Sequence, residues 1–438
     1  MSGIGIAFLS IGVMLLLIYS GLHVSIALIL LSFLGVWLLK GNFDIASNML
    51  VIAFKDSISD YIFGVVPLFV LMGLLVAVAG IGRDTFEVAA QLFRKVLGGL
   101  GIATVAANAV FAAITGISIA SAAVFTKVAV PEMMRHGYSG RFAVGVVAGS
   151  SVLGMLLPPS LLFILYGVLT EQSVGTLFIA GILPGILLAV VYCIGILAMG
   201  KWWPSFIGAG QPALDEPARD MGVGEMLVKL APIVILVAVV IGGIYGGFFT
   251  PTEAGAAGAL GALVIALVRR RLTWEGFWQV LVQTGHTTSS ICFLIMGASL
   301  YSRMLAMSGM PSWLGTWVME SGMGATGIIV ALMLVIILLG TILDSASILL
   351  LTLPIAIPIL TGTGVDLIWL GVLVIIAVEI GLLTPPFGIA VFVVRATLGP
   401  DSQVTLNDIF AGAAPFAAMM LGVLLLIFFF PWLATALI

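Results

Sequence analysis

Long apolar runs without a single charged residue dominate this sequence. Runs of at least 22 uncharged residues cover 2–39, 61–82, 96–126, 142–170, 172–200, 230–252, 276–302, 321–343 and 409–438. A helix needs about 20 apolar residues to cross the hydrocarbon core of a bilayer. The runs are unbroken rather than alternating, which is the helical pattern and not that of barrel strands. The sequence therefore predicts an all-α polytopic membrane protein.

Composition agrees with this prediction. Of the 438 residues, 62% are hydrophobic and 8% are charged, whereas soluble domains carry about 25% charged residues. Soluble enzymes, nucleic-acid-binding proteins and disulfide scaffolds are therefore excluded. The two cysteines, Cys193 and Cys292, lie far apart within apolar runs and are predicted to be small buried side chains. The net charge of −3 is too small to indicate a partner.

Basic residues indicate which loops face the cytoplasm. Short cytoplasmic loops are rich in Lys and Arg, and the clearest cluster is Arg269-Arg270-Arg271. Counting crossings backwards from this cluster places the polar linker 201–229 inside and the N-terminus outside. The first basic residue is Lys40, so the N-terminal apolar run is not predicted to be a cleavable signal peptide.

The run 96–126 fits neither one crossing nor two. It is bordered by Lys95 and Lys127, and the same count places both of these residues inside. Two crossings need about 40 residues, but only 31 are free of charge. A re-entrant helical hairpin that enters and leaves on the cytoplasmic side fits both facts. Because non-helical backbone at that depth is tolerated only against protein or a wet cavity, the hairpin predicts a site.

The two halves of the chain share short matches in register. The segment 69–73 matches 293–297 at a spacing of 224, while Ser118 matches Ser345 and Pro158-Pro159 matches Pro385-Pro386 at a spacing of 227. Each half would hold five full crossings, about ten in all, and an odd number requires the second copy to be inverted. Inverted repeats with broken helices are a recurring plan of secondary transporters.

This repeat predicts two domains with the same parts. The first inverted repeat would cover 1–223, with its hairpin at about 96–130 and a broken transmembrane helix at about 141–170. The second would cover 224–438, with its hairpin at about 325–361 and a broken helix at about 367–397. Plain crossings at 3–39 and 226–268 would form a scaffold. Three amphipathic stretches, 44–60, 84–95 and 311–320, suit helices that lie along a surface.

Candidate ion- and substrate-binding residues lie at the hairpin tips and helix breaks. Tandem prolines interrupt a helix; the freed carbonyls suit a hard cation, and the N-terminus after the break suits a substrate carboxylate. The first-half candidates are Gly116, Ser118, Ser121, Gly149, Ser150, Ser151, Gly154, Pro158 and Pro159. The second-half candidates are Gly340, Thr341, Asp344, Ser345, Glu379, Gly381, Thr384, Pro385 and Pro386.

Each candidate also has a structural interpretation. Asp344 and Glu379 lie in apolar surroundings, where ionisable groups are functional by default, but either could be a hydrogen-bonded or protonated structural carboxyl. The hydroxyl groups near the first tip, with Asn108 and Thr115, could bond to backbone or to a neighbouring helix. The proline pairs could be simple kinks. Thr250 and Glu253 are predicted to form a capping box at the start of a helix, with Pro251 as its first residue.

Five motifs in this order resemble the large membrane subunit of tripartite ATP-independent periplasmic (TRAP) transporters, the DctM-like family. The resemblance covers essentially the whole chain. Its motifs are Pro131-Glu132-Met133 with Gly137-Tyr138, Leu157-Pro158-Pro159-Ser160 with Tyr166-Gly167, Thr250-Pro251-Thr252-Glu253-Ala254, Gly340 to Asp344, and Thr384-Pro385-Pro386-Phe387-Gly388.

The resemblance implies a function and partners. It implies sodium-driven uptake of an organic acid across the bacterial inner membrane, without ATP and by an elevator-type movement. The acid would be delivered by a periplasmic substrate-binding protein, and a small four-helix membrane subunit would complete the transporter. Sodium ions would lie near Ser118 and 149–154 in the first half, and near Asp344, Ser345 and 381–384 in the second.

Three other functions stay open at this point. A stand-alone sodium/dicarboxylate symporter would have the same inverted plan. A channel would share the crossings. A membrane-embedded enzyme is less compatible, because the sequence lacks clustered His or Cys residues and paired carboxylates, so the chain is predicted not to be an enzyme.

Overall fold

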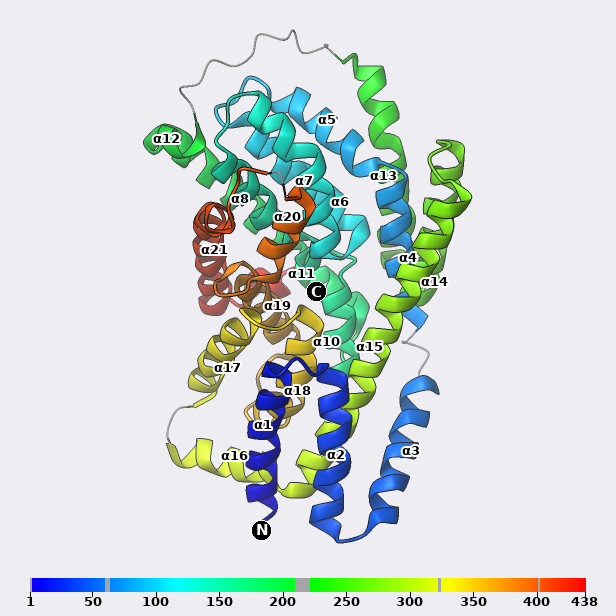
Figure 1. The fold of residues 1–438 in the computed structure, drawn as a ribbon, viewed down its shortest axis with the longest axis vertical. Helices are drawn as coiled ribbons and strands as arrows, with labels where there is room; N and C mark the ends of the chain where they lie inside the picture. The colour runs from blue at the N-terminus through cyan, green and yellow to red at the C-terminus, as the bar shows by residue number, and fades with distance from the viewer. Residues whose placement is uncertain (1, 60–63, 209–220, 322–323, 401) are drawn as a thin grey trace.

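The computed structural model shows a chain built from helices (Figure 1). It describes residues 2–59, 64–208, 221–321, 324–400 and 402–438. Within these ranges every regular element is a helix, so the prediction of an all-α membrane fold is confirmed. The middle of the predicted polar linker, 209–220, and the last residue of the amphipathic stretch 44–60 lie outside the described residues.

The helix bounds follow the predicted segments closely. The first half contains α1 (Gly3–Tyr19), α2 (Val24–Lys40), α3 (Phe43–Ser59), α4 (Val65–Val78), α5 (Ile81–Phe93), α6 (Gly99–Thr115), α7 (Ser118–Arg135), α8 (Gly140–Ser151), α9 (Leu153–Leu156), α10 (Leu161–Thr170), α11 (Val174–Trp202) and α12 (Pro204–Ile207). The second half contains α13 (Val223–Tyr245), α14 (Pro251–Val268), α15 (Trp274–Ser308), α16 (Met310–Ser321), α17 (Gly324–Gly340), α18 (Ser345–Thr361), α19 (Leu367–Leu383), α20 (Ile389–Leu398), α21 (Leu406–Phe429) and α22 (Trp432–Thr435).

Several helices are long and apolar enough to cross a bilayer. Among the described residues there are five, or seven if each of two bent pairs is one span. The bent pairs are α4 with α5, at 61°, and α8–α9 with α10, at 41°. Shorter apolar helices include α6 of hairpin 1 and both helices of hairpin 2, α17 and α18. The chain is therefore a multi-pass membrane protein, while the count of about ten full crossings stays a prediction.

Two helical hairpins occupy different halves of the molecule. Hairpin 1 consists of α6 and α7, joined at Gly116 and Ile117, and hairpin 2 consists of α17 and α18, joined at 341–344. In Figure 1 hairpin 1 lies in the upper half and hairpin 2 in the lower half. This arrangement agrees with the predicted inverted repeat, which itself stays a prediction.

Two helices are interrupted where the proline pairs occur. Break 1, residues 157–160, separates α9 from α10, and break 2, residues 384–388, separates α19 from α20. Both Pro-Pro peptide bonds, Pro158-Pro159 and Pro385-Pro386, are cis. Proline lacks a backbone N–H and its ring collides with the preceding turn, so the helix ends before each pair.

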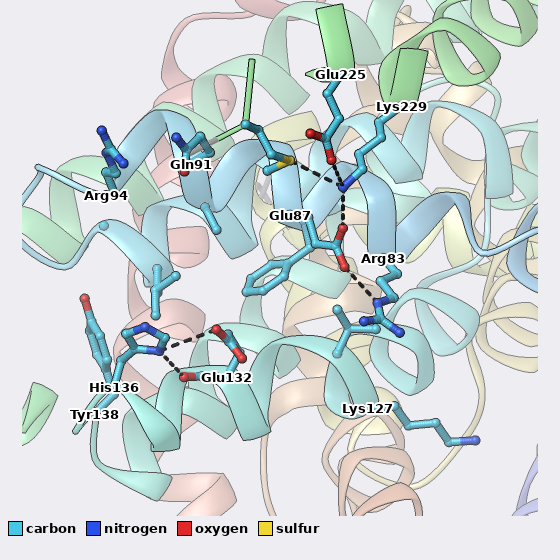
Figure 2. A pocket seen from close by; sticks show the side chains of 16 residues that line it. Arg83, Glu87, Gln91, Arg94, Lys127, Glu132, His136, Tyr138, Glu225 and Lys229 are labelled. Atoms are coloured by element: carbon cyan, nitrogen blue, oxygen red, sulfur yellow. Dashed lines mark hydrogen bonds and ion pairs between the residues drawn. The ribbon is translucent and has the colours of Figure 1, made fainter. Parts of the chain in front are cut away.

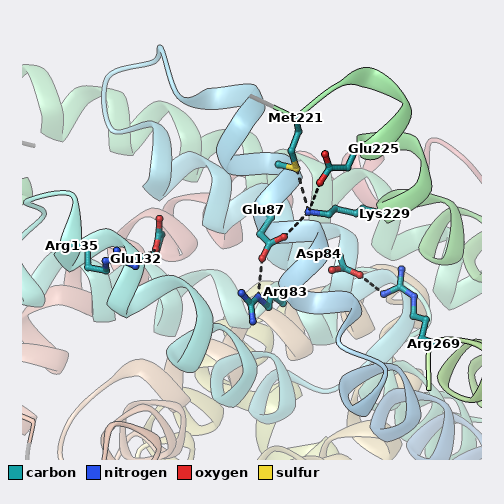
Figure 3. Close-up of polar contacts among 9 residues, drawn as sticks. All are labelled: Arg83, Asp84, Glu87, Glu132, Arg135, Met221, Glu225, Lys229 and Arg269. Carbon is teal, nitrogen blue, oxygen red and sulfur yellow. Dashed lines mark hydrogen bonds and ion pairs between the residues drawn. The ribbon is translucent and has the colours of Figure 1, made fainter. Parts of the chain in front are cut away.

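Ion pairs hold the amphipathic helix α5 against its neighbours (Figure 3). Asp84 of α5 pairs with Arg269 at the end of α14, and both side chains are largely buried, with 11% and 19% of their area exposed. Glu87 accepts from Lys229 of α13 at 2.8 Å and from Arg83 at 2.8 Å. These contacts join α5 to α13 and α14.

A capping box starts α14. The Thr250 hydroxyl accepts the Glu253 N–H at 3.3 Å, and the Glu253 carboxylate accepts the Thr250 N–H at 2.8 Å. Pro251 is the first helical residue. These contacts satisfy two backbone donors that a helix start otherwise leaves without a partner.

The cap gives a first prediction. Thr250→Ala should lower the free energy of unfolding by about 1 kcal/mol, because the Glu253 N–H loses its acceptor. Thr250→Ser keeps that acceptor and should leave stability within a few tenths of a kcal/mol. Thermal unfolding of the two purified variants against wild type measures both effects. Equal losses for Ala and Ser would contradict the assignment.

Candidate functional site

Each hairpin tip is hydrogen-bonded to the break in its own half. At the first tip the carbonyl of Gly116 accepts the N–H of Leu161 at 3.2 Å. At the second tip the carbonyl of Thr341 accepts the N–H groups of Phe387 at 3.1 Å and Gly388 at 3.3 Å. Leu161 and Gly388 are themselves 227 residues apart. Both halves therefore make a contact between tip and break, and its donors occupy matching positions.

Glycines allow these backbones to approach each other. Gly116 has a φ of +61°, and a Cβ there would lie 2.5 Å from the carbonyl oxygen of Pro159. A Cβ on Gly154 would lie 3.2 Å from the carbonyl carbon of Ile117. In the second half, a Cβ on Gly340 would lie 2.7 Å from the Cα of Gly381. These glycines are therefore required by close packing at the tips and breaks.

The hydroxyl groups of the first half fall into two sets. Ser150 and Ser151 are bonded to carbonyls of their own helix, and Ser150 also accepts from the Asn108 amide at 2.6 Å. The hydroxyls of Ser118 and Ser121 are buried without a hydrogen-bond partner. Because buried polar groups are nearly always bonded, these two oxygens, with the free carbonyl oxygen of Asn108, are the better candidates for ligands.

In the second half, several candidates already have partners. Asp344 is the N-cap of α18, and its carboxylate accepts the N–H groups of Ala346 and Ser347, each at 3.1 Å, and the Ser347 hydroxyl. The hydroxyls of Thr341 and Thr384 donate to carbonyls one turn earlier. Asp344 thus has a structural role as the N-cap of α18.

The carboxyl group of Glu379, unlike that of Asp344, has no hydrogen-bond partner. Its side chain lies in the continuous part of α19 with 1% of its surface exposed, and neither carboxyl oxygen has a hydrogen-bond partner. No described hydroxyl group reaches hydrogen-bond geometry with either oxygen. Glu379 is therefore a buried carboxyl without a partner among the described residues.

One predicted site residue lies elsewhere, and some contacts were missed. Gly149 packs against Phe416 of α21 rather than against a hairpin tip. Sequence reasoning did not single out Leu161, although a shift of 227 pairs it with Gly388 of the second break motif. It also missed Tyr192, whose hydroxyl is buried without a partner and which no local motif marks.

The donor set suits a hard, monovalent cation. The unpartnered groups are oxygens from hydroxyls, an amide and a carboxylate, and breaks in transmembrane helices supply carbonyls of the kind that coordinate Na⁺. In the described part of the chain no group of three or more His, Cys, Asp or Glu residues could hold a metal ion. The residues present therefore fit sodium.

A separate polar cavity lies where α5 meets hairpin 1 (Figure 2). Its volume is about 860 Å³, and its lining includes Arg94, just before hairpin 1, and Lys127 and Glu132 on α7. Residues before and after the tip of hairpin 1 thus border the same cavity. A hairpin has this geometry, and a single crossing through 96–126 does not.

Comparisons with known proteins agree with this architecture. Residues 11–433 match the family model described as "Tripartite ATP-independent periplasmic transporter, DctM component". The crystal structure of the YdaH transporter of Alcanivorax borkumensis is similar in fold, with a TM-score of 0.57 and 13% identity over 91% of this chain and 90% of that one.

Curated relatives are similar over most of their length. The C4-dicarboxylate TRAP transporter large permease protein DctM of Pseudomonas aeruginosa is 31% identical, covering 89% of this chain and 88% of that protein. The sialic acid TRAP transporter large permease protein SiaM of Vibrio cholerae is also 31% identical, covering 95% and 94%. The chain therefore belongs to the DctM family of TRAP transporter large permeases.

Proposed function

We propose that this permease carries out sodium-coupled secondary uptake of an organic acid. The main support is that each hairpin tip is hydrogen-bonded to the second residue after the proline pair of its own half. Such paired, interrupted helices place carbonyls and helix N-termini at one depth, where an ion and an anionic substrate can be bound together. The proposal places the protein in the bacterial inner membrane with its N-terminus in the periplasm.

Sodium would be held by oxygens of the tips and breaks. In the first half these are the unpartnered hydroxyls of Ser118 and Ser121 and carbonyls near break 1. In the second half they are Asp344, Ser345 and carbonyls near break 2. The substrate carboxylate would lie near the N-termini of α10 and α20, because a helix N-terminus carries partial positive charge.

The packing of the helices supports a proposed movement of the hairpins against a scaffold. Hairpin 1 contacts broken helix 2 through α7 and α20, and hairpin 2 contacts broken helix 1 through α18 and α10. These cross-contacts tie both hairpins and both breaks into one body. The plain helices pair with one another, α2 with α15 and α4 with α14, and they meet the hairpins where α15 contacts α18 and α4 contacts α6. An elevator-type motion of the first group against the second is the proposed transport step.

The proposed partners are a periplasmic substrate-binding protein and a small four-helix membrane subunit. Relatives of this chain are named for C4-dicarboxylates and for sialic acid, so a small carboxylic acid is the proposed substrate class. Reconstitution in proteoliposomes with an inward sodium gradient tests the proposal. Accumulation should require both sodium and the binding protein; sodium-independent uptake would overturn it, and uptake without the binding protein would indicate a stand-alone symporter.

The charge of Asp344 gives a second prediction. Asp344→Ser keeps an N-cap, since Ser caps helices about as well as Asp, but removes the carboxylate. We expect the sodium concentration for half-maximal uptake to rise about tenfold, because one anionic oxygen is lost. Sodium titration of uptake in proteoliposomes measures this.

A matched control comes from α19. Asp366 is also an N-cap and accepts two backbone N–H groups, at 2.8 and 3.3 Å, but it lies at the far end of α19 from break 2. Asp366→Ser should leave the sodium dependence unchanged. An unchanged sodium response in Asp344→Ser as well would remove Asp344 from the ion site.

A further inference from the structure

One membrane-spanning helix carries polar side chains in its middle. Helix α15 has the length and composition of a membrane span, yet residues 283–290 read Gln-Thr-Gly-His-Thr-Thr-Ser-Ser. Trp274 and Trp278 at its start are 79% and 60% exposed, as expected for aromatic residues at a membrane surface. At a rise of about 1.5 Å per residue, His286 lies about 18 Å along the helix from Trp274. Since the hydrocarbon core is about 30 Å thick, the polar segment lies within it.

Four of these polar side chains form a stripe along α15. The polar stripe consists of Gln279, Gln283, His286 and Ser290. Spacings of four, three and four residues place its members on one side of a helix. All four are exposed, whereas Val280 and Ile291, on an adjacent side of the helix, are buried. The polar stripe is therefore not covered by the part of the chain that the structure describes.

The polar stripe has few hydrogen bonds of its own. Gln279 donates to Glu275 at 3.5 Å, which is long for a hydrogen bond. Among the described residues, the side chains of Gln283, His286 and Ser290 have no hydrogen-bond partner. Hydrocarbon supplies neither donors nor acceptors, so polar groups exposed at this depth are unfavourable unless protein or water meets them.

A face of α13 shows what the exposed side of another span looks like in this protein. Its exposed side chains include Val234, Ile235 and Val239, and such a face suits lipid. The polar stripe of α15 does not. Its spacing is that of the seam between two packed helices, and Ser, Gln and His side chains bond across helices in membranes. The occupant that fits is therefore a second transmembrane helix with polar side chains.

We propose that the polar stripe of α15 is the docking face for a transmembrane helix of the small membrane subunit. That helix would present hydrogen-bonding side chains at the depth of Gln283 and His286. The inference rests on the proposed function, which includes this subunit as a partner, and it adds where on the permease the subunit binds.

The first test is co-purification of the full-length permease with its co-expressed small subunit. The double variant Gln283→Leu/His286→Leu removes the hydrogen-bonding groups and should lower the small subunit recovered per permease at least tenfold. The Tm of the permease alone should equal or exceed that of wild type, because leucine suits lipid. Gln283→Asn keeps an amide and should retain the small subunit. Wild-type recovery with the double variant would overturn the proposal.

A matched pair of single variants provides the control. Ser289 and Ser290 are both exposed and lie at the same depth, but they point about 100° apart around the helix. Ser290→Leu should lower recovery of the small subunit about threefold or more, and Ser289→Leu should leave it unchanged. Equal recovery with the two variants would contradict the assignment of the stripe.

The second test identifies what lies against the polar stripe in the membrane. A photo-crosslinking amino acid at position 286 should join the permease to the small subunit, and one at position 234 on α13 should not. Cross-linking at 286 to a second permease, or to no protein, contradicts the proposal. In a chain with Cys193→Ser and Cys292→Ser, His286→Cys should be protected from a charged maleimide in the assembled transporter. Rapid labelling there would indicate a water-filled passage instead.

The outcomes distinguish the docking face from the proposed function. If uptake needs the small subunit but Gln283→Leu/His286→Leu still retains it, the docking face is wrong and the proposed function stands. If the wild-type permease accumulates the acid without a small subunit, the proposed partner fails and the docking face fails with it.

Discussion

Gly116→Ala is expected to reduce uptake at least tenfold. The residue has a φ of +61°, where a side chain is disfavoured, and its Cβ would lie 2.5 Å from the carbonyl oxygen of Pro159. The colliding atom belongs to the backbone of break 1, which cannot rotate away as a flexible side chain can. The tip of hairpin 1 must therefore move away from break 1. The hydrogen bond from Leu161 to the Gly116 carbonyl would then be lost. Transport in proteoliposomes, with protein yield and Tm measured alongside, tests this.

Gly41→Ala is the matched control. Gly41 has nearly the same backbone, with a φ of +64°, but nothing lies within 4 Å of the position that an alanine methyl group would occupy there. Both variants share the cost of a left-handed alanine, about 1 kcal/mol. Only Gly116→Ala also has the collision, so Gly41→Ala should transport normally. Equal transport by both variants would show that the contact between hairpin 1 and break 1 is dispensable.

Asp84→Ala is expected to cause the largest loss of stability, about 3 kcal/mol. Removing one partner of a buried ion pair leaves the other charge buried without compensation, which costs about 3–5 kcal/mol. We take the lower end because 19% of the Arg269 side chain is still exposed. The expected result is a Tm several degrees below that of wild type. Thermal unfolding of the purified protein measures it.

A neighbouring pair provides the control for Asp84. Arg83 and Glu87 lie on the same helix and pair at 2.8 Å, but 65% of the Arg83 side chain is exposed. An exposed pair contributes about 0–1 kcal/mol, so Arg83→Gln should change Tm very little. A similar loss for both variants would mean that the charge of α5, and not the buried pair with Arg269, sets stability.

The positions of most helices and of both helix breaks could be predicted from the sequence. Hairpins expected at about 96–130 and 325–361 are found as α6–α7 and α17–α18, and the broken helices end within a few residues of the expected limits. These features follow from local chemistry. Apolar runs set helix length, while tandem prolines and a left-handed glycine end a helix wherever they occur. No tertiary contact is needed to infer them.

The roles of the two acidic residues were harder to predict. In sequence both Asp344 and Glu379 are carboxyls in apolar surroundings, and Asp344 stands closer to the expected hairpin tip. In the structure Asp344 has hydrogen-bond donors from the start of its own helix, whereas Glu379 has none. The difference depends on the neighbours that other helices bring.

The membrane class, the positions of the hairpins and breaks, and the matches between the halves could be inferred from the chain alone, because each depends on short stretches of apolar, proline or glycine residues. Which buried polar atoms have hydrogen-bond partners could be seen only in the tertiary structure. In the described part of the chain, Ser118 and Glu379 are buried without a partner, whereas Ser150 and Asp344 have hydrogen bonds. Burial and hydrogen bonding depend on how helices pack, and no local pattern specifies that.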